Sequence, residues 1–111
     1  MKFTIKIMFT LVIAVVLSAC ASPPSRIAPV AVATSEYDGL SCSQLASELS
    51  RVSTNLAEAE RRQRNAVAGD AFTVFLVLVP ASALAGDSEA EVARLKGEEI
   101  ALTNSLARRS C

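Results

Sequence analysis

Two stretches of the chain carry the apolar repeat of an amphipathic helix, and a cysteine stands at the outer end of each. In the first stretch, apolar residues recur at alternating intervals of four and three, and the spacing continues weakly for two further positions. The residues of this seam are Leu45, Leu49, Val52, Leu56 and Ala59, followed by Gln63 and Ala66. Ser41 and Gln44 match a capping box before the seam, and Gly69-Asp70 matches a helix stop after it. The pattern predicts a helix over 43–68.

A second helix is predicted near the end of the chain, over about 88–109. Its apolar positions share one face, which Glu99 interrupts, and they are Val92, Leu95, Leu102 and Leu106. Ser88 and Glu91 match another capping box. Gly97 lies in the middle of this helix, where glycine costs about 1 kcal/mol relative to alanine. Two interpretations of Gly97 stay open: it admits close approach of the partner helix, or it has no structural role.

Antiparallel pairing of the two helices brings their cysteines together. At 1.5 Å per residue the helices are about 39 and 33 Å long, so Cys42, at the start of the first, lies beside Cys111, after the end of the second. The same pairing sets a basic cluster opposite an acidic one, namely Arg61, Arg62 and Arg64 opposite Asp87, Glu89 and Glu91. We therefore predict an all-α fold, an antiparallel helical hairpin closed by a Cys42–Cys111 disulfide.

The predicted disulfide closes a loop of about 70 residues and, in an oxidising compartment, contributes roughly 4 kcal/mol to stability. A pair of free thiols and a bridge between two chains are the alternatives. Zinc fits poorly, because two thiolates in a chain without histidine fall short of four ligands. We expect no metal site and no other cofactor.

An apolar connector, residues 71–85, joins the predicted helices and is interrupted by Pro80. Its large apolar residues are Phe72, Val74, Phe75, Leu76, Val77, Leu78 and Val79. The connector could span a membrane, dip into one, or fold back as part of the hairpin's own core. Spanning is disfavoured, because this helix would cover about 22 Å of a hydrocarbon core about 30 Å thick. Between the other two we favour contact with a membrane or a protein partner, since a monomer rarely exposes such a patch.

The first nineteen residues have the build of a secretory signal peptide. Lys2 and Lys6 make the start positive, an apolar run over 7–17 follows, and two small residues close the segment. An ordinary signal peptide followed by a chance cysteine and an uncleaved membrane anchor are the alternatives to the interpretation that follows.

Leu17-Ser18-Ala19-Cys20 resembles the lipobox of bacterial lipoprotein precursors. The resemblance implies cleavage before Cys20, diacylation of its sulfur and acylation of the new terminus, which makes Cys20 the candidate lipidation site. By the same resemblance, the absence of aspartate at Ala21 implies an anchor in the outer rather than the inner membrane, facing the periplasm.

Residues 20–40 are expected to form a flexible tether. Pro23, Pro24 and Pro29 withhold backbone donors, and the intervening serines and alanines offer little to bury. An extended segment of this kind reaches about 50–60 Å at roughly 3.1 Å per residue. The predicted organisation is a signal peptide over 1–19, a lipidated tether over 20–40 and a helical hairpin domain over 41–111.

Several short sequence features lie in the folded part of the chain. They are Ser41-Cys42 with Leu45 and Glu48, the apolar stretch Phe75–Pro80, the run Arg94-Leu95-Lys96-Gly97-Glu98, and the terminal Cys111. With these features, most of Tyr37–Cys111 resembles small, uncharacterised lipoproteins of Gram-negative bacteria. The resemblance implies no activity.

Composition narrows the function classes. The eleven basic residues match the eleven acidic ones, and two of the basic ones lie in the leader, so the mature chain carries a charge of about −2 and nucleic-acid binding is not expected. Without histidine, no side chain has an ordinary pKa near neutrality to activate a serine, so an enzyme is not expected either. Two classes remain. One is a structural or interaction lipoprotein that docks an envelope partner or self-associates, and the other is a membrane-active module whose segment 71–85 inserts into a bilayer.

Overall fold

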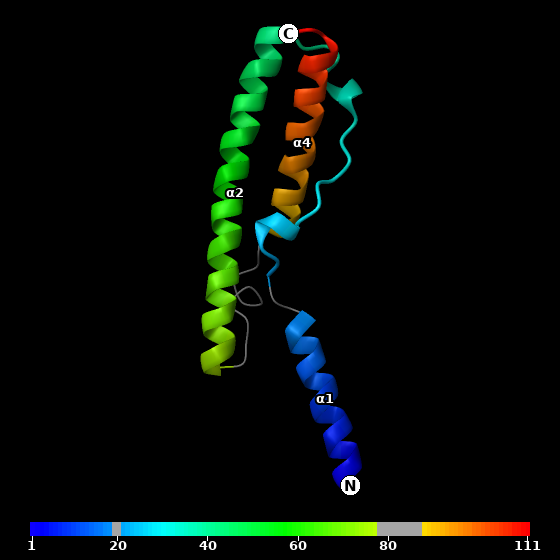
Figure 1. The fold of residues 1–111 in the computed structure, drawn as a ribbon, viewed down its shortest axis with the longest axis vertical. Helices are drawn as coiled ribbons and strands as arrows, with labels where there is room; N and C mark the ends of the chain where they lie inside the picture. Colours follow the sequence, from blue (N-terminus) through cyan, green and yellow to red (C-terminus); the bar gives the residue numbers. More distant parts are fainter. Residues whose placement is uncertain (19–20, 78–87) are drawn as a thin grey trace.

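The computed structural model describes residues 1–18, 21–77 and 88–111, and over 12–18 and 72–77 it describes the backbone alone. Within these ranges all regular secondary structure is helical, and α2 and α4 lie side by side in opposite directions (Figure 1). The fold is therefore all-α and contains the predicted antiparallel hairpin. The elements in chain order are α1 (Lys2–Ser18), two short 3-10 turns η1 (Pro24–Arg26) and η2 (Thr34–Tyr37), α2 (Cys42–Val77) and α4 (Glu89–Arg108).

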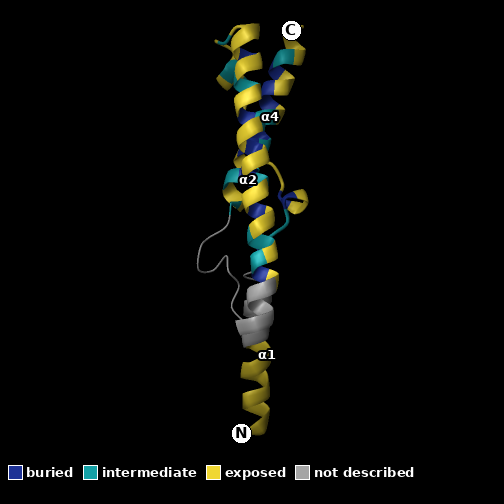
Figure 2. Ribbon diagram, turned by 90° about the vertical axis from the view of Figure 1, so that its left-hand side faces the viewer, coloured by how far each residue is buried: buried dark blue, intermediate teal, exposed yellow. Residues whose placement is uncertain are grey.

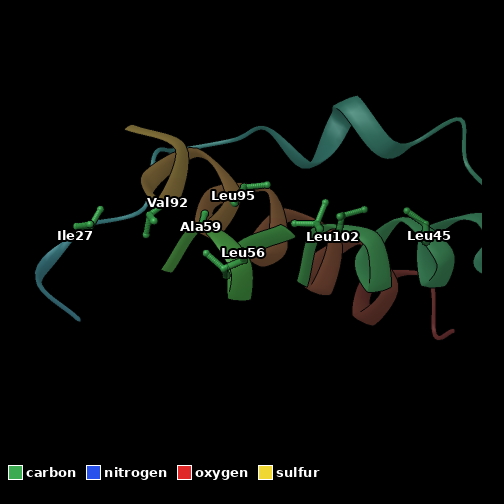
Figure 3. Packing of buried hydrophobic residues seen from close by; sticks show 8 residues of the cluster. Ile27, Leu45, Leu56, Ala59, Val92, Leu95 and Leu102 are labelled. Carbon is green, nitrogen blue, oxygen red and sulfur yellow. The ribbon is translucent and has the colours of Figure 1, made fainter. Parts of the chain in front are cut away.

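The core of the hairpin is the predicted apolar seam. Buried residues gather where α2 and α4 face each other (Figure 2), and Figure 3 shows their side chains along the contact. Among the described side chains of the two helices, the buried apolar ones are Leu45, Val52, Leu56 and Ala59 from α2, and Val92, Leu95, Ala101 and Leu102 from α4. Each fully buried leucine or valine contributes about 1.5–3 kcal/mol relative to an exposed one, so this seam is the main source of stability.

The two cysteines at the ends of the hairpin are bonded, as predicted. The sulfurs of Cys42 and Cys111 lie 2.00 Å apart, and their α-carbons lie 5.7 Å apart across a sequence separation of 69.

A turn after α4 delivers Cys111 to that bond. The Cys111 N–H donates to the carbonyl of Leu106, and the Ser110 N–H donates to that of Ala107, which together form a Schellman motif. The motif needs a left-handed residue, and Ser110 supplies it with a φ of 55°. The chain end therefore folds back toward the start of α2.

The two predicted capping boxes have different outcomes. At the start of α2 the box is confirmed, because the Ser41 N–H donates to Gln44 Oε1 at 2.8 Å and the Gln44 N–H donates to Ser41 Oγ at 3.2 Å. At the start of α4 the prediction is wrong, since the Ser88 side chain makes no cap bond. Its partner Glu91 instead accepts from Arg62 of α2 at 2.9 Å. A contact between helices has replaced the local one.

The predicted end of the first helix is also wrong. α2 passes through Gly69-Asp70 and continues to Val77, nine residues beyond the predicted end at Ala68. Glycine in a helix costs about 1 kcal/mol, a penalty that tertiary contacts outweigh. Asp70 is such a contact, because its carboxylate is buried and accepts a hydrogen bond from the Ala21 N–H.

The predicted flexible tether differs most from the structure. Residues 21–40, which we call the strap, lie against the hairpin rather than extending away from it (Figure 1). Ala21, Pro24 and Ile27 are buried, and Ile27 belongs to the same apolar cluster as the hairpin seam. Proline-rich composition indicates an extended backbone, but it does not exclude packing of that backbone on a neighbour.

We predict that the Cys42–Cys111 bond carries much of the stability. In a parent chain that lacks the leader and carries Cys20→Ser, replacing both remaining cysteines by serine should lower the free energy of unfolding by roughly 4 kcal/mol, because the unfolded chain regains its loop entropy. Urea titration followed by helical circular dichroism measures the change. Reduction of the parent by a thiol should have the same effect. Equal stability of the oxidised and reduced parents would contradict the prediction.

Candidate functional site where the strap meets the hairpin

The strap is fastened to α2 at its first described residue. The Ala21 N–H donates to Asp70 Oδ2 at 2.6 Å, and the Asp70 side chain is only 2% exposed. Cys20, the candidate lipidation site, directly precedes Ala21 and lies outside the described residues. Because Asp70 lies 28 positions after Cys42 on one continuous helix, this junction is at the opposite end of the hairpin from the disulfide.

A single buried amide ties three parts of the chain together. Gln63 is fully buried, and its Nε2 donates to the carbonyl of Ser22 at 2.8 Å. Its Oε1 accepts from the Ser88 N–H at 2.7 Å. The side chain of one α2 residue therefore holds both the start of the strap and the start of α4. The seam pattern includes position 63, but it does not predict this double contact.

The lysine of α4 binds the backbone of the strap. Lys96 Nζ donates to the carbonyls of Pro24 at 2.5 Å and Ile27 at 3.1 Å. These carbonyls belong to the first residue of η1 and to the residue that follows it. The proline begins the turn with its φ already suited to it. Hydrogen bonds from a charged donor are the stronger ones, at about 1.5–3 kcal/mol each. Lys96 therefore binds the strap through its backbone rather than through its side chains.

Gly97 settles the open question about the middle of α4. The Val30 N–H donates to the carbonyl of Ala93 at 2.9 Å, which draws the strap onto the helix surface. A Cβ at Gly97 would lie 2.0 Å from the carbonyl oxygen of Val30, closer than any real contact. The glycine does admit a close approach, and its neighbour is the strap rather than the partner helix. Only a residue without a side chain fits here.

Small residues follow one another at every fourth position of α4 on the face that meets the strap. They are Ala93, Gly97, Ala101 and Ser105. The Ser105 hydroxyl lies 3.5 Å from the carbonyl of Thr34, and it also donates to the carbonyl of Ala101 at 2.9 Å. Positions four apart share a helix face, so these residues form a shallow path for a backbone. This spacing is the sequence signal that could have identified the strap's docking surface.

The far end of the strap is held by the last turn of α4. The Arg109 guanidinium donates to the carbonyls of Leu40 and Asp38, next to the disulfide. Nearby, burial and then the charge of Glu98 raise the pKa of Tyr37, while the hydrogen bond from Arg51 lowers the pKa of Glu48. The strap is thus bound from its first residue to its last.

The structure confirms the predicted meeting of basic and acidic clusters at Arg62 and Glu91. Arg62 contacts Glu91 at 2.9 Å across the hairpin, and each side chain is 43% exposed. Arg64 instead pairs with Glu60 of its own helix at 3.6 Å. Such exposed pairs contribute about 0–1 kcal/mol, so they help to set the register more than the stability. Asp87 lies outside the described residues.

The apolar connector is described only in part. Residues 72–77 form the last turns of α2, so the backbone of Phe72, Val74, Phe75, Leu76 and Val77 is helical, whereas Leu78 and Val79 lie outside the described residues. In the parts of the chain that the structure describes, no helix has both the length and the apolar character to cross a membrane. The same parts contain no group of three or more histidine, cysteine or acidic side chains placed to hold a metal ion.

Comparison with known proteins yields no relative. No protein family, curated protein or solved structure matches the chain.

The polar groups described at this site hold backbone rather than face an open cavity. Asp70, Gln63, Lys96 and Arg109 all contact main-chain atoms of the strap, and among the described residues no buried side-chain donor or acceptor lacks a partner. The chemistry of the arrangement is that of fastening one segment of the chain to another.

We predict that Gln63 is the most sensitive polar residue of the hairpin. Gln63→Leu should lower the free energy of unfolding by about 2 kcal/mol or more, because the Ser22 carbonyl and the Ser88 N–H both lose their buried partner. The matched control is Asn65→Leu, two positions along on the exposed surface, which should change stability by less than about 0.5 kcal/mol. Thermal and urea unfolding of the oxidised chain give both values. Equal effects of the two substitutions would contradict this role.

Proposed function

We propose that the protein is a membrane-anchored envelope lipoprotein that serves as a structural or protein-interaction module. The observation that carries the proposal is the bond between Ala21 and Asp70. It fastens the residue that follows the candidate lipidation site to one end of a disulfide-closed hairpin. An anchor at Cys20 would therefore hold a defined body with its other end directed away from the lipid.

The leader and the disulfide support an envelope lipoprotein together. The leader carries the positive start, apolar run and small residues of a secretory signal, followed by the lipobox-like Leu17–Cys20. Two or three acyl chains on Cys20 anchor firmly, since each buried methylene contributes about 0.8 kcal/mol. The Cys42–Cys111 bond fits an oxidising compartment such as the periplasm. The outer membrane is the proposed location, facing that compartment.

The proposed partners are membrane lipid, through Cys20, and an envelope protein or a second copy of the chain. The hairpin's apolar seam is filled by its own two helices and by Ile27 of the strap, and its exposed faces carry both charge signs. A partner would therefore meet a mixed polar surface or the disulfide end of the hairpin.

A second candidate function is that of a membrane-active module. It is favoured by the continuation of α2 beyond Asp70, where the residues Ala71–Val77 are apolar apart from one threonine. These seven residues extend the helix by about 10 Å on the side where the strap begins. In a lipid-anchored chain this apolar end would lie at the membrane surface, where it could enter the outer part of the bilayer.

Lipid attachment is tested by substitution of Cys20. In cells given a labelled palmitate, the wild-type chain should incorporate label and fractionate with membranes, and Cys20→Ala should do neither, because the acceptor sulfur is gone. Cys111→Ser is the control, since it also removes a cysteine but leaves the lipobox-like sequence intact. Mass analysis of the purified protein should show a mature chain that begins at acylated Cys20. A wild-type protein that keeps its leader or carries no lipid overturns the proposal.

The two functions are separated by flotation of the oxidised chain without leader or lipid. A membrane-active module should float with phospholipid vesicles, and Phe75→Asp should abolish flotation because a charge in the apolar end opposes insertion. Ala46→Asp is the control, since it adds the same charge to an exposed position near the other end of α2. An interaction module should not float, and crosslinking of the lipidated protein in cells should recover a defined protein neighbour. Failure to float eliminates the membrane-active function, and the lack of any neighbour counts against the interaction module.

A further inference from the structure

The strap contacts α4 at several points from its start to its end, and these contacts follow the same order along both segments. On α4, the early residues of the strap meet Lys96, its middle lies on Gly97, and its last residues meet Arg109. Residue numbers rise together on both segments, so the strap runs parallel to α4 from the Asp70 junction toward the disulfide end. The face of small residues on α4 is therefore a binding surface that is already occupied, and its occupant is the chain's own residues 21–40.

We propose that the docked strap is a fixed mount, which holds the hairpin upright on its lipid anchor and presents the disulfide end at a set height. This inference rests on the proposed lipid anchoring at Cys20. Asp70, where the mount begins, lies 28 helical residues from Cys42, so the disulfide end stands about 40 Å beyond the junction. With a free tether of the same sequence, the distance between the lipid and the hairpin could instead vary by up to about 50–60 Å.

The contacts between the hairpin and the strap favour a strap that stays bound. The hairpin contacts strap carbonyls through Lys96, Gln63 and Arg109, and it buries the Ile27 side chain in the core cluster. Prolines lower the conformational entropy that the strap loses on docking, because their φ is already restricted. The covalent link through Ser41 raises the effective concentration of the strap at its site. Each of these effects favours the docked state over the free one.

Trypsin reports directly on whether the strap is docked. Arg26 is the only lysine or arginine between Cys20 and Arg51, so cleavage within the strap occurs after Arg26 or not at all. In the docked strap the Arg26 N–H donates to the Pro23 carbonyl at 2.9 Å, and Ile27 is only 5% exposed. A protease needs several residues in an extended, accessible form, so cleavage measures the population of open strap.

The first experiment uses the oxidised mature chain carrying Cys20→Ala, in solution. Mass spectrometry follows cleavage after Arg26, and a synthetic peptide spanning 21–33 gives the rate for a free strap. The chain should be cut at least on the order of 100-fold more slowly than the peptide. Cleavage at the rate of the peptide overturns the proposal.

Gly97→Ala is the decisive variant. Alanine is a better helix former than glycine, so α4 itself is not weakened, but the new Cβ would collide with the backbone of Val30. Cleavage after Arg26 should accelerate by on the order of 10-fold or more while helix content and the disulfide are retained. Gly39→Ala is the matched control, because nothing lies within 4 Å of its Cβ position, and it should be cut as slowly as the parent.

Lys96→Met gives an independent check. It keeps the aliphatic stem of the lysine and removes only the ammonium that binds the Pro24 and Ile27 carbonyls, so it should also accelerate cleavage. If neither Gly97→Ala nor Lys96→Met changes the rate while Gly39→Ala behaves as the parent, the docked strap is not what protects Arg26 and the proposal fails.

The second experiment places the lipidated protein on a supported phospholipid bilayer. Neutron reflectometry should show a protein layer that extends about 40 Å beyond the junction in the wild type, and a layer of different and broader extent for Gly97→Ala. Identical profiles would overturn the mount. A slow cleavage in solution combined with a purified protein that lacks lipid would leave the strap docked but refute lipid anchoring, so the two failures are distinguishable.

Discussion

The bond between Cys42 and Cys111 joins the start of one helix to the residues after the end of the other, and the rest of the molecule depends on that closure. Two helices alone share one narrow apolar seam, and a folded part of this size buries so little apolar surface that its stability is marginal. By tying the ends, the disulfide limits the registers in which the seam can pair. The Schellman turn at Ser110 makes the closure possible, because it directs the last residue back toward α2. The packing of the seam, the turn after α4 and the disulfide thus all favour the same pairing of the two helices.

The strap adds a third layer to this two-helix body. Ile27 enters the core cluster, and Gln63 links strap, α2 and α4 through one buried amide. The layer is possible because α4 is flat on that side, where small residues recur at every fourth position and Gly97 leaves room for a carbonyl. A segment that by composition offers little to bury is thereby held through its backbone. Small proteins often need such supplementary contacts, because their cores alone are marginal.

This third layer changes what lipid anchoring would mean for the protein. A long free tether separates a domain from its membrane and leaves its orientation open. The strap is bound to Asp70 through Ala21, one residue after the candidate lipidated cysteine. If that cysteine were lipidated, the end of α2 beyond Asp70 would lie near the lipid and the disulfide would lie at the far end. In such an anchored chain, the membrane-active module would place its apolar end within the bilayer, whereas the structural module would keep that end at the surface and bind a protein neighbour.

The elements that follow from local patterns were predictable from the amino-acid sequence alone. The seam at alternating intervals of four and three, the cap at Ser41 and the pairing of Cys42 with Cys111 all follow from helical periodicity and length, because those properties are set by residues close in the chain. The end of α2 and the cap of α4 were not, since Asp70 and Glu91 take partners from distant segments in place of local ones. The docking of residues 21–40 was decided by tertiary structure for the same reason. Its contacts join side chains of α2 and α4 to strap carbonyls, and a carbonyl is present at every residue, so the sequence of the strap does not reveal them. The signal in the sequence is on α4 instead, in the small residues at every fourth position.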